Sequence, residues 1–215
     1  MGKIRLLLAD DHKMVREGLK AFFAPTDDFE VVAEAADGIE AVEKAGQTLP
    51  DVILLDLVMP NMNGIEAANQ ITNKWPDAKI IIITSSLEES QVIAAIKAGA
   101  AGYLLKDSSP LEIEDAVKKV NRGETAFPSR ITSIMVKELN KPSKPPSKCT
   151  TLTDRETEIL RLIANGMSNQ DIADQLFLSV WTVRTYVTAI LDKLEVDNRT
   201  QATLYALREG LVDLD

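Results

Sequence analysis

Residues 51–64 read Asp-Val-Ile-Leu-Leu-Asp-Leu-Val-Met-Pro-Asn-Met-Asn-Gly, and this stretch decides the fold. Its apolar run at 52–55 predicts a short strand that is buried on both faces. The run stops at Asp56, and Pro60 and Gly64 then supply the residues of a turn. Because open α/β sheets place their sites at the carboxyl ends of the strands, Asp56 is a candidate site residue.

The same alternation of strand and helix extends over the first 121 residues. Apolar runs predict four more strands, and each strand is followed by apolar residues at helical spacing. The alternation predicts a parallel five-stranded sheet with helices on both faces. The other strands are expected at 4–9, 29–35, 79–84 and 102–105, and the helices at 13–23, 39–47, 65–74, 90–98 and 110–121.

The pattern changes after residue 123. Residues 131–139 suit a helix, and Asn-Lys-Pro-Ser-Lys-Pro-Pro-Ser-Lys at 140–148 is typical of a semi-rigid linker. The rest of the chain predicts an all-α domain of four helices, the first two of which begin with capping boxes. The expected domains are 1–123, a linker at 124–150, and 151–215, with helices from Thr153 to Gly166, from Ser168 to Leu176, at 180–194 and at 200–209.

Length and composition narrow the class of protein. The 215 residues suit two modest domains, and 45% of them are apolar, which is enough for real cores. No apolar run approaches the ~20 residues of a membrane span, and the N-terminus lacks a signal-peptide pattern. The single cysteine, Cys149, allows no internal disulfide and no thiolate metal cluster. A cytoplasmic protein with no membrane partner is expected.

Net charge is distributed unevenly. The whole chain carries −9, with −8 in residues 1–128, +4 in residues 129–150 and −5 in residues 151–215. An acidic C-terminal module argues against a strong nonspecific grip on nucleic acid or on an anionic membrane.

Polar residues end four of the five predicted strands. If the strands are parallel, Asp10, Asp11 and Asp56 converge at one edge with Thr84 and Lys106. Three carboxylates at short range oppose joint ionisation, and a hard divalent cation such as Mg²⁺ compensates them. Asp56 is then a candidate nucleophile for a phosphoryl group, with Lys106 and Thr84 as partners for the phosphoryl oxygens.

A simpler interpretation applies to each of these residues taken alone. Any one strand-end side chain, taken alone, is better explained as a turn cap or a solvated group. Four such positions together favour a site. His12, the only histidine, lies beside the cluster and is interpreted as a helix-start residue.

Residues 4–122 resemble the receiver domain of bacterial two-component response regulators. The resemblance implies a flavodoxin-like (βα)5 fold in which a histidine kinase phosphorylates Asp56, and one departure is Asp107 where a proline often follows the lysine. The matching positions are the Asp10–Asp11 pair, Asp56 followed by Pro60 and Gly64, Thr84, and Lys106 after Gly-Tyr-Leu-Leu.

The same resemblance implies roles for individual residues. Asp11, Asp56 and the backbone carbonyl of Val58 would ligate Mg²⁺, with Asp10 helping through water. Thr84 and Tyr103 would form a switch pair, in which the hydroxyl moves toward the phosphoryl group and the ring packs inward.

The third C-terminal helix, at 180–194, carries an apolar stripe on one side and polar residues on the other. A short helix, a turn and this helix suit a helix-turn-helix, in which Arg184 could reach a guanine edge and Thr185 or Thr188 a thymine methyl group or a phosphate. Spacing alone leaves an ordinary helical bundle equally open. The stripe comprises Val183, Val187, Ile190, Leu191 and Leu194, and the outer side comprises Trp181, Thr185, Thr188 and Asp192 with Arg184 on its flank.

Residues 151–212 resemble the LuxR-type helix-turn-helix of the NarL/FixJ subfamily. The matching stretches are Leu-Thr-Asp-Arg-Glu from 152, Ile-Ala-Asn-Gly from 163, Ser-Asn-Gln-Asp-Ile-Ala from 168, Thr-Val-Arg-Thr from 182, and Lys-Leu from 193. Departures are Trp181, where a small or basic residue is common, and Tyr186, where histidine is common. By the resemblance Arg184, Thr185 and Thr188 would face bases, and Asn169, Gln170, Thr182 and Lys193 would contact the DNA backbone.

These features together predict a phosphorylation-controlled transcription factor rather than an enzyme. With few cations per module, useful affinity for double-stranded promoter DNA requires two modules, so phosphorylation is expected to drive a homodimer. The expected partners are a sensor histidine kinase, promoter DNA and RNA polymerase.

Two alternatives come from other classes. One is a regulator that acts only through protein partners. The other, a haloacid-dehalogenase-like phosphatase, requires an Asp two residues after the nucleophile, where this chain has Val58.

Overall fold

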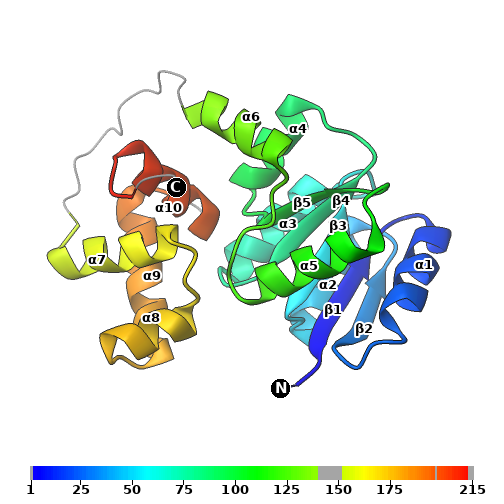
Figure 1. Cartoon of the computed structure of the whole chain (residues 1–215), viewed down its shortest axis with the longest axis horizontal. Helices are drawn as coiled ribbons and strands as arrows, with labels where there is room; N and C mark the ends of the chain where they lie inside the picture. The colour runs from blue at the N-terminus through cyan, green and yellow to red at the C-terminus, as the bar shows by residue number, and fades with distance from the viewer. Residues whose placement is uncertain (1, 140–151, 197, 213–215) are drawn as a thin grey trace.

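The computed structural model describes residues 2–139, 152–196 and 198–212, which fold into a sheet domain followed by a helical domain (Figure 1). The parallel sheet has strand order β2-β1-β3-β4-β5, so the predicted five-stranded parallel sheet is confirmed. Its strands are β1 (Ile4–Ala9), β2 (Phe29–Ala35), β3 (Val52–Asp56), β4 (Ile80–Thr84) and β5 (Gly102–Leu105), and its helices are α1 (Lys13–Phe23), α2 (Gly38–Thr48), α3 (Gly64–Lys74), α4 (Glu89–Lys97) and α5 (Pro110–Asn121).

Both faces of the sheet are covered by helices, as the apolar runs predict. Strands β3 and β4 are buried along their whole length. Successive residues of a strand point to opposite faces, and in β1 Leu6 packs with α1 and α5 whereas Leu7 packs with α2, α3 and α4. The sheet lies between these two cores, and the carboxyl ends of β1, β3, β4 and β5 meet at one of its edges.

Helix α6 (Ser129–Leu139) belongs physically to the sheet domain although it lies within the stretch predicted as linker. Ile131 and Ile134 are 0% and 6% exposed and pack in the core under α4. The chain just before α6 extends the sheet edge, where the Tyr103 N–H donates to the Ala126 carbonyl oxygen (3.1 Å). The Pro- and Lys-rich stretch at 140–148 lies outside the described residues.

The helical domain contains the four predicted helices. They are α7 (Asp154–Ala164), α8 (Asn169–Leu176), α9 (Val180–Leu194) and α10 (Arg199–Arg208). Capping boxes begin α7 at Thr153 and α8 at Ser168, as the sequence predicts. The predicted stripe of α9 is buried against the other three helices. Nowhere in the described part of the chain does a helix combine the length and apolarity that crossing a bilayer requires.

Candidate functional site

The carboxyl edge of the sheet gathers the polar residues that the sequence places at strand ends. Asp10 directly follows β1, Asp56 and Thr84 are the last residues of β3 and β4, and Lys106 directly follows β5. Asp10 and Asp56 are each 3% exposed, and Thr84 is 1% exposed. Their convergence follows from the parallel order of the strands.

Lys106 bridges the two buried carboxylates. Its Nζ lies 2.7 Å from Asp10 Oδ2 and 2.8 Å from Asp56 Oδ2. Because the lysine side chain is itself only 19% exposed, the three charges share a poorly solvated space. The predicted meeting of Asp10, Asp56 and Lys106 is observed. We call this group, together with Asp11, the acidic pocket.

Burial and charge shift the pKa values in the acidic pocket. Burial raises the pKa of the Asp56 carboxyl, the Lys106 ammonium opposes that rise, and the negative charge of Asp10 adds to it. For Lys106, burial lowers the pKa, but its hydrogen bonds to Asp10 and Asp56 outweigh burial and leave the pKa raised. The lysine is therefore held as a cation between two carboxylates.

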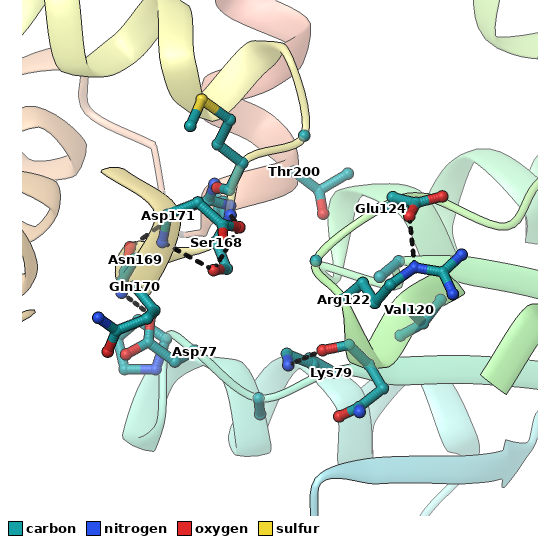
Figure 2. A pocket seen from close by; sticks show the side chains of 18 of the residues that line it. Asp77, Lys79, Val120, Arg122, Glu124, Ser168, Asn169, Gln170, Asp171 and Thr200 are labelled. Atoms are coloured by element: carbon teal, nitrogen blue, oxygen red, sulfur yellow. Dashed lines mark hydrogen bonds and ion pairs between the residues drawn. The ribbon is translucent and has the colours of Figure 1, made fainter. Parts of the chain in front are cut away.

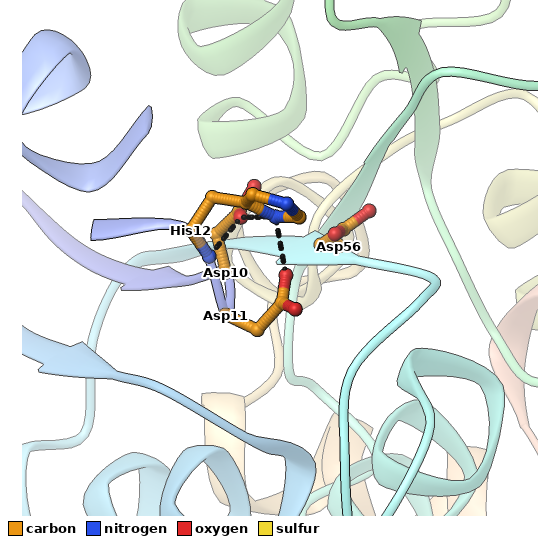
Figure 3. Close-up of side chains that lie close together, drawn as sticks. All are labelled: Asp10, Asp11, His12 and Asp56. Atoms are coloured by element: carbon orange, nitrogen blue, oxygen red, sulfur yellow. Dashed lines mark hydrogen bonds and ion pairs between the residues drawn. The ribbon is translucent and has the colours of Figure 1, made fainter. Parts of the chain in front are cut away.

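Four side chains in this region present possible metal-ligand atoms to one another (Figure 3). The ligand atoms of Asp10, Asp11, His12 and Asp56 all lie within 4.8 Å of one another. His12 is the N-cap residue of α1, which matches its interpretation as a helix-start residue. Its Nδ1 also lies 2.6 Å from Asp11 Oδ1 and 3.4 Å from Asp10 Oδ1. The sequence offered no signal for this second contact.

The loop after β3 holds Val58 beside the pocket. Val58 is 67% exposed, and its backbone N–H bonds to the Asp56 carboxylate, which lowers the pKa of that group. A Cβ atom on Gly64 would lie 2.0 Å from the Asp56 backbone oxygen, so only glycine lets α3 begin this close to β3. The role of the Val58 carbonyl as a metal ligand stays a prediction.

The proposed switch residues lie beside the acidic pocket. The Ser86 N–H donates to Thr84 Oγ1 (3.3 Å), which leaves the threonine hydroxyl proton able to donate elsewhere. Tyr103 is 0% exposed, with its ring in the core and its hydroxyl donating to the Ser86 carbonyl oxygen (3.0 Å). Burial raises the pKa of this phenol to about 12. The ring already lies inward in this conformation.

The outer side of α9 is exposed where the sequence predicts contacts with bases. Arg184, Thr185 and Thr188 are exposed, and each threonine hydroxyl donates to the carbonyl oxygen four residues earlier. Trp181 is 75% exposed and Phe177, in the turn before α9, is 95% exposed. The indole is therefore open to solvent and is not buried against the preceding turn.

Three of the predicted backbone contacts are engaged within the helical domain. Lys193 Nζ lies 2.7 Å from Glu156 Oε2, and Glu156 is 6% exposed. The Lys193 hydrogen bond and that of the Thr153 backbone lower the pKa of Glu156. The Gln170 amide donates to Asp174 (2.9 Å), and the Thr182 and Ser179 hydroxyl oxygens lie 2.7 Å apart.

The remaining predicted contact, Asn169, and Arg184 are both bonded to the sheet domain. Asn169 Nδ2 donates to Asp77 Oδ1 (2.6 Å), and Arg184 Nε lies 3.0 Å from Asp77 Oδ2. Asp77 precedes β4 and so stands at the amino edge of the sheet, opposite the acidic pocket. A cavity of about 790 Å³ remains between the two domains beside this contact. Figure 2 shows side chains that line it, among them Asp77 and Asn169.

Sequence reasoning missed the residues that join the two domains. Asp77, Asn198 and Gln201 each bond across the interface, the last two to the Lys97 carbonyl oxygen. Burial strongly lowers the pKa of Arg199 in the same interface, to about 10. Asn198 carries a local signal as a helix N-cap, but the order of residues does not reveal which surface it faces.

Known proteins give the same picture of both halves. Residues 6–118 match the response regulator receiver domain, and residues 150–206 match the luxR family of bacterial regulatory proteins. The transcriptional regulatory protein LiaR of Bacillus subtilis (strain 168) is 46% identical over 210 residues, covering 98% of this chain and 100% of LiaR.

Solved structures agree with the sequence matches. The response regulator ChrA of a heme-sensing two-component system matches with a TM-score of 0.54 and 35% identity, covering 99% of this chain and 100% of ChrA. A structure of two RcsB dimers bound to two parallel DNAs matches with a TM-score of 0.56 and 25% identity, covering 97% of this chain and 99% of that one. The chain therefore belongs to the response regulators of two-component systems, with an N-terminal receiver domain and a C-terminal DNA-binding domain of the luxR type.

Proposed function

We propose that this response regulator is phosphorylated on Asp56 by a sensor histidine kinase and then binds promoter DNA as a dimer. The observation that carries the proposal is the contact between Asp56 and the Lys106 ammonium (2.8 Å) at the buried carboxyl edge of the sheet. A nucleophilic carboxylate needs to be ionised, and this ammonium opposes the effect of burial on the pKa of Asp56.

The phosphoryl transfer needs few protein groups. An Asp56 carboxylate oxygen attacks the phosphorus of the kinase phosphohistidine, the P–N bond breaks, and its electron pair returns to the imidazole nitrogen. The product is an acyl phosphate on Asp56. Lys106, which now bridges two carboxylates, would pair with a phosphoryl oxygen, and the Thr84 hydroxyl would donate to another.

The donor set of the acidic pocket fits Mg²⁺, because its carboxylate oxygens are hard ligands. Asp11, Asp56 and the Val58 carbonyl would hold the ion directly, and Asp10 would hold it through water. Bound there, Mg²⁺ supplies positive charge to the incoming phosphoryl oxygens.

DNA recognition would use the exposed side of α9. Arg184, Thr185 and Thr188 would face base edges, and Asn169, Gln170, Thr182 and Lys193 would contact the backbone. In the present conformation Asp77 holds both Arg184 and Asn169, so two of the predicted DNA contacts are bonded to the sheet domain. Phosphorylation would favour an undocked state, and a bias of a few kcal/mol is enough.

The net charge of the helical domain supports the dimer in this proposal. Residues 151–215 carry a net charge of −5, so one module neutralises few phosphates. Two modules on adjacent half-sites double the specific contacts, and RNA polymerase would be recruited at the same promoter.

The proposal is tested by incubating the full chain with Mg²⁺ and a small phosphodonor. Wild-type protein should gain the mass of one phosphoryl group and form dimers, whereas Asp56→Ala should gain neither. Asp115→Ala, which removes an exposed carboxylate from α5, is the matched control and should behave as wild type. Phosphorylation of the Asp56→Ala chain at the wild-type rate would overturn the assignment.

A regulator that acts only through protein partners is the second candidate. Selection from random double-stranded oligonucleotides, with phosphorylated protein, separates the two. Enrichment of a sequence supports DNA binding, and failure to enrich any sequence supports the alternative.

A further inference from the structure

Helix α4 connects the two edges of the sheet. It begins at Glu89, five residues after Thr84 at the carboxyl edge, and it ends at Lys97 beside the DNA-binding domain (Figure 1). Helix α10 contacts α4. A displacement of α4 that begins near the acidic pocket therefore reaches the domain interface without any other element between them.

The C-terminal end of α4 leaves a backbone carbonyl for the other domain. Gly99 has a φ of +93°, and the Ala100 N–H donates back to the Ala95 carbonyl oxygen (3.1 Å), which closes the last turn. The Lys97 carbonyl oxygen instead accepts two N–H groups from the DNA-binding domain. These come from Asn198 Nδ2 (2.8 Å) and Gln201 Nε2 (2.6 Å).

Asn198 satisfies the ends of two helices at once. Its Oδ1 accepts the Gln201 backbone N–H (3.0 Å) as the N-cap of α10, while its Nδ2 donates to the last residue of α4. The side chain is 2% exposed. The positive end of the α10 dipole thus meets the negative end of the α4 dipole through one amide.

The receiver domain offers a fitted socket for this amide. A Cβ atom on Gly99 would lie 3.1 Å from Asn198 Cγ and 2.8 Å from Thr72 Cγ2, so a larger residue would crowd the site. Thr72 is 2% exposed and its Oγ1 lies 3.0 Å from the Ala98 carbonyl oxygen, which anchors the other side of the socket.

The socket differs from the interdomain ion pair between Arg184 and Asp77. Arg184 and Asp77 are 63% and 41% exposed, and exposed ion pairs hold surfaces together weakly. Asn198, by contrast, is 2% exposed, so its hydrogen bond to the Lys97 carbonyl oxygen is shielded from water while the domains are docked. The shielded amide contact should therefore contribute more to the docking than the exposed ion pair does.

We propose that Asn198 is the positioning residue through which the DNA-binding domain is held on helix α4 and released when α4 shifts. The docking role of Asn198 is argued from these contacts, whereas release of the DNA-binding domain by phosphorylation rests on the proposed function. If the C-terminal end of α4 moves, the Lys97 carbonyl oxygen moves away from the side-chain amides of Asn198 and Gln201 at the same time.

Substitution of Asn198 by Asp tests this directly in the full chain. Asp caps α10 as well as Asn does, but it presents no N–H to the Lys97 carbonyl oxygen. Asn198→Ser is the second variant, since Ser also caps a helix but is too short to bridge. Asn63→Asp makes the same change at the N-cap of α3, where the side chain accepts within its own helix.

Domain separation is read from distances between nitroxide labels. The labels sit on the exposed positions Glu17→Cys and Gln175→Cys in a Cys149→Ser chain, and thermal unfolding confirms that every variant is folded. Asn198→Asp and Asn198→Ser should raise the open-to-closed ratio about tenfold, whereas Asn63→Asp should leave it unchanged. A wild-type distance distribution in both folded Asn198 variants would overturn the inference.

Phosphorylation separates this inference from the proposed function. Phosphorylated wild-type protein should show the same open distances as Asn198→Asp, and phosphorylation should add little to the variant. If Asn198→Asp opens the chain and DNA affinity stays low, the DNA-binding proposal fails and the docking role of Asn198 stands. If phosphorylation opens the Asn198→Asp chain as much as it opens the wild type, release of the DNA-binding domain through Asn198 is refuted.

Discussion

The two edges of the parallel sheet hold charges in opposite ways. At the carboxyl edge Asp10, Asp56 and Lys106 are enclosed together, and the two aspartates are each 3% exposed. At the amino edge Asp77 meets a half-exposed arginine, and the buried contact there is made by the neutral amide of Asn198. The first arrangement suits a site that receives new charge, and the second suits an interface that separates.

Energetic expectations follow this difference. Removing one partner of a buried charge pair costs about 3–5 kcal/mol because it strands the other charge. Exposed pairs contribute about 0–1 kcal/mol. Substitutions at the carboxyl edge should therefore lower the free energy of unfolding far more than substitutions at the amino edge.

The largest expected effect is that of Lys106→Met in metal-free buffer. This variant keeps the apolar stem but leaves Asp10 and Asp56 facing each other, so the receiver domain should lose about 3 kcal/mol of unfolding free energy. Added Mg²⁺ should restore more stability to the variant than it gives to the wild type.

Lys119→Met is the matched control for this measurement. Lys119 pairs with Asp115 on the surface of α5, with side chains 43% and 60% exposed. Its removal should change the free energy of unfolding by less than about 0.5 kcal/mol. Equal losses in the two variants would erase the contrast between buried and exposed charge.

A smaller effect, of opposite sign, is expected for Asp56→Asn. Burial raises the pKa of Asp56 in the folded chain, so the folded state binds this proton more tightly than the unfolded state. Stability from this group is therefore fully present below the unfolded pKa and is lost as the pH rises through the folded pKa. At neutral pH Asn should stabilise the receiver domain by roughly 1 kcal/mol, a rise of about 4 °C in the unfolding midpoint.

Thermal unfolding of both chains between pH 4 and pH 8, without Mg²⁺, measures this difference. The gap between Asp56→Asn and wild type should narrow as the pH falls. A gap that widens toward acid would mean that the pairing with Lys106 outweighs burial at this position.

The smallest effect is expected at the amino edge. Asp77→Asn removes the charge that pairs with Arg184, and unphosphorylated protein should then bind operator DNA about threefold more tightly. Asp27→Asn is the control, because it removes one negative charge from a pair with Lys3 that does not touch the DNA-binding domain. Equal gains from both variants, in salt titrations of DNA binding, would assign the change to net charge alone.

Much of the fold could be predicted because its signals are local. Apolar runs marked every strand, and the caps at Thr153 and Ser168 marked two helix starts to within a residue or two. The acidic pocket could be predicted for a related reason, since parallel strands bring their carboxyl ends together whatever the loops do.

The domain interface could not be predicted because nothing local encodes it. Asp77 lies in a polar turn, and Asn198 has the ordinary appearance of a helix cap. Lys193 illustrates the same limit, because a basic residue near the end of α9 could face either DNA or a carboxylate of its own domain. The packing of α7 against α9 places Glu156 Oε2 2.7 Å from Lys193 Nζ. Pairings between distant segments depend on tertiary packing.

Helix α6 sets where the receiver domain can be cut from the rest of the chain. Ile131 and Ile134 complete the core beneath α4, so a shortened protein that stops at residue 123 would leave that apolar surface open to solvent. Such a fragment should aggregate and should bind its own copies through a face that the intact chain never shows. A fragment that runs to residue 139 keeps its own cover, and pairing measured on it would report on the native surface.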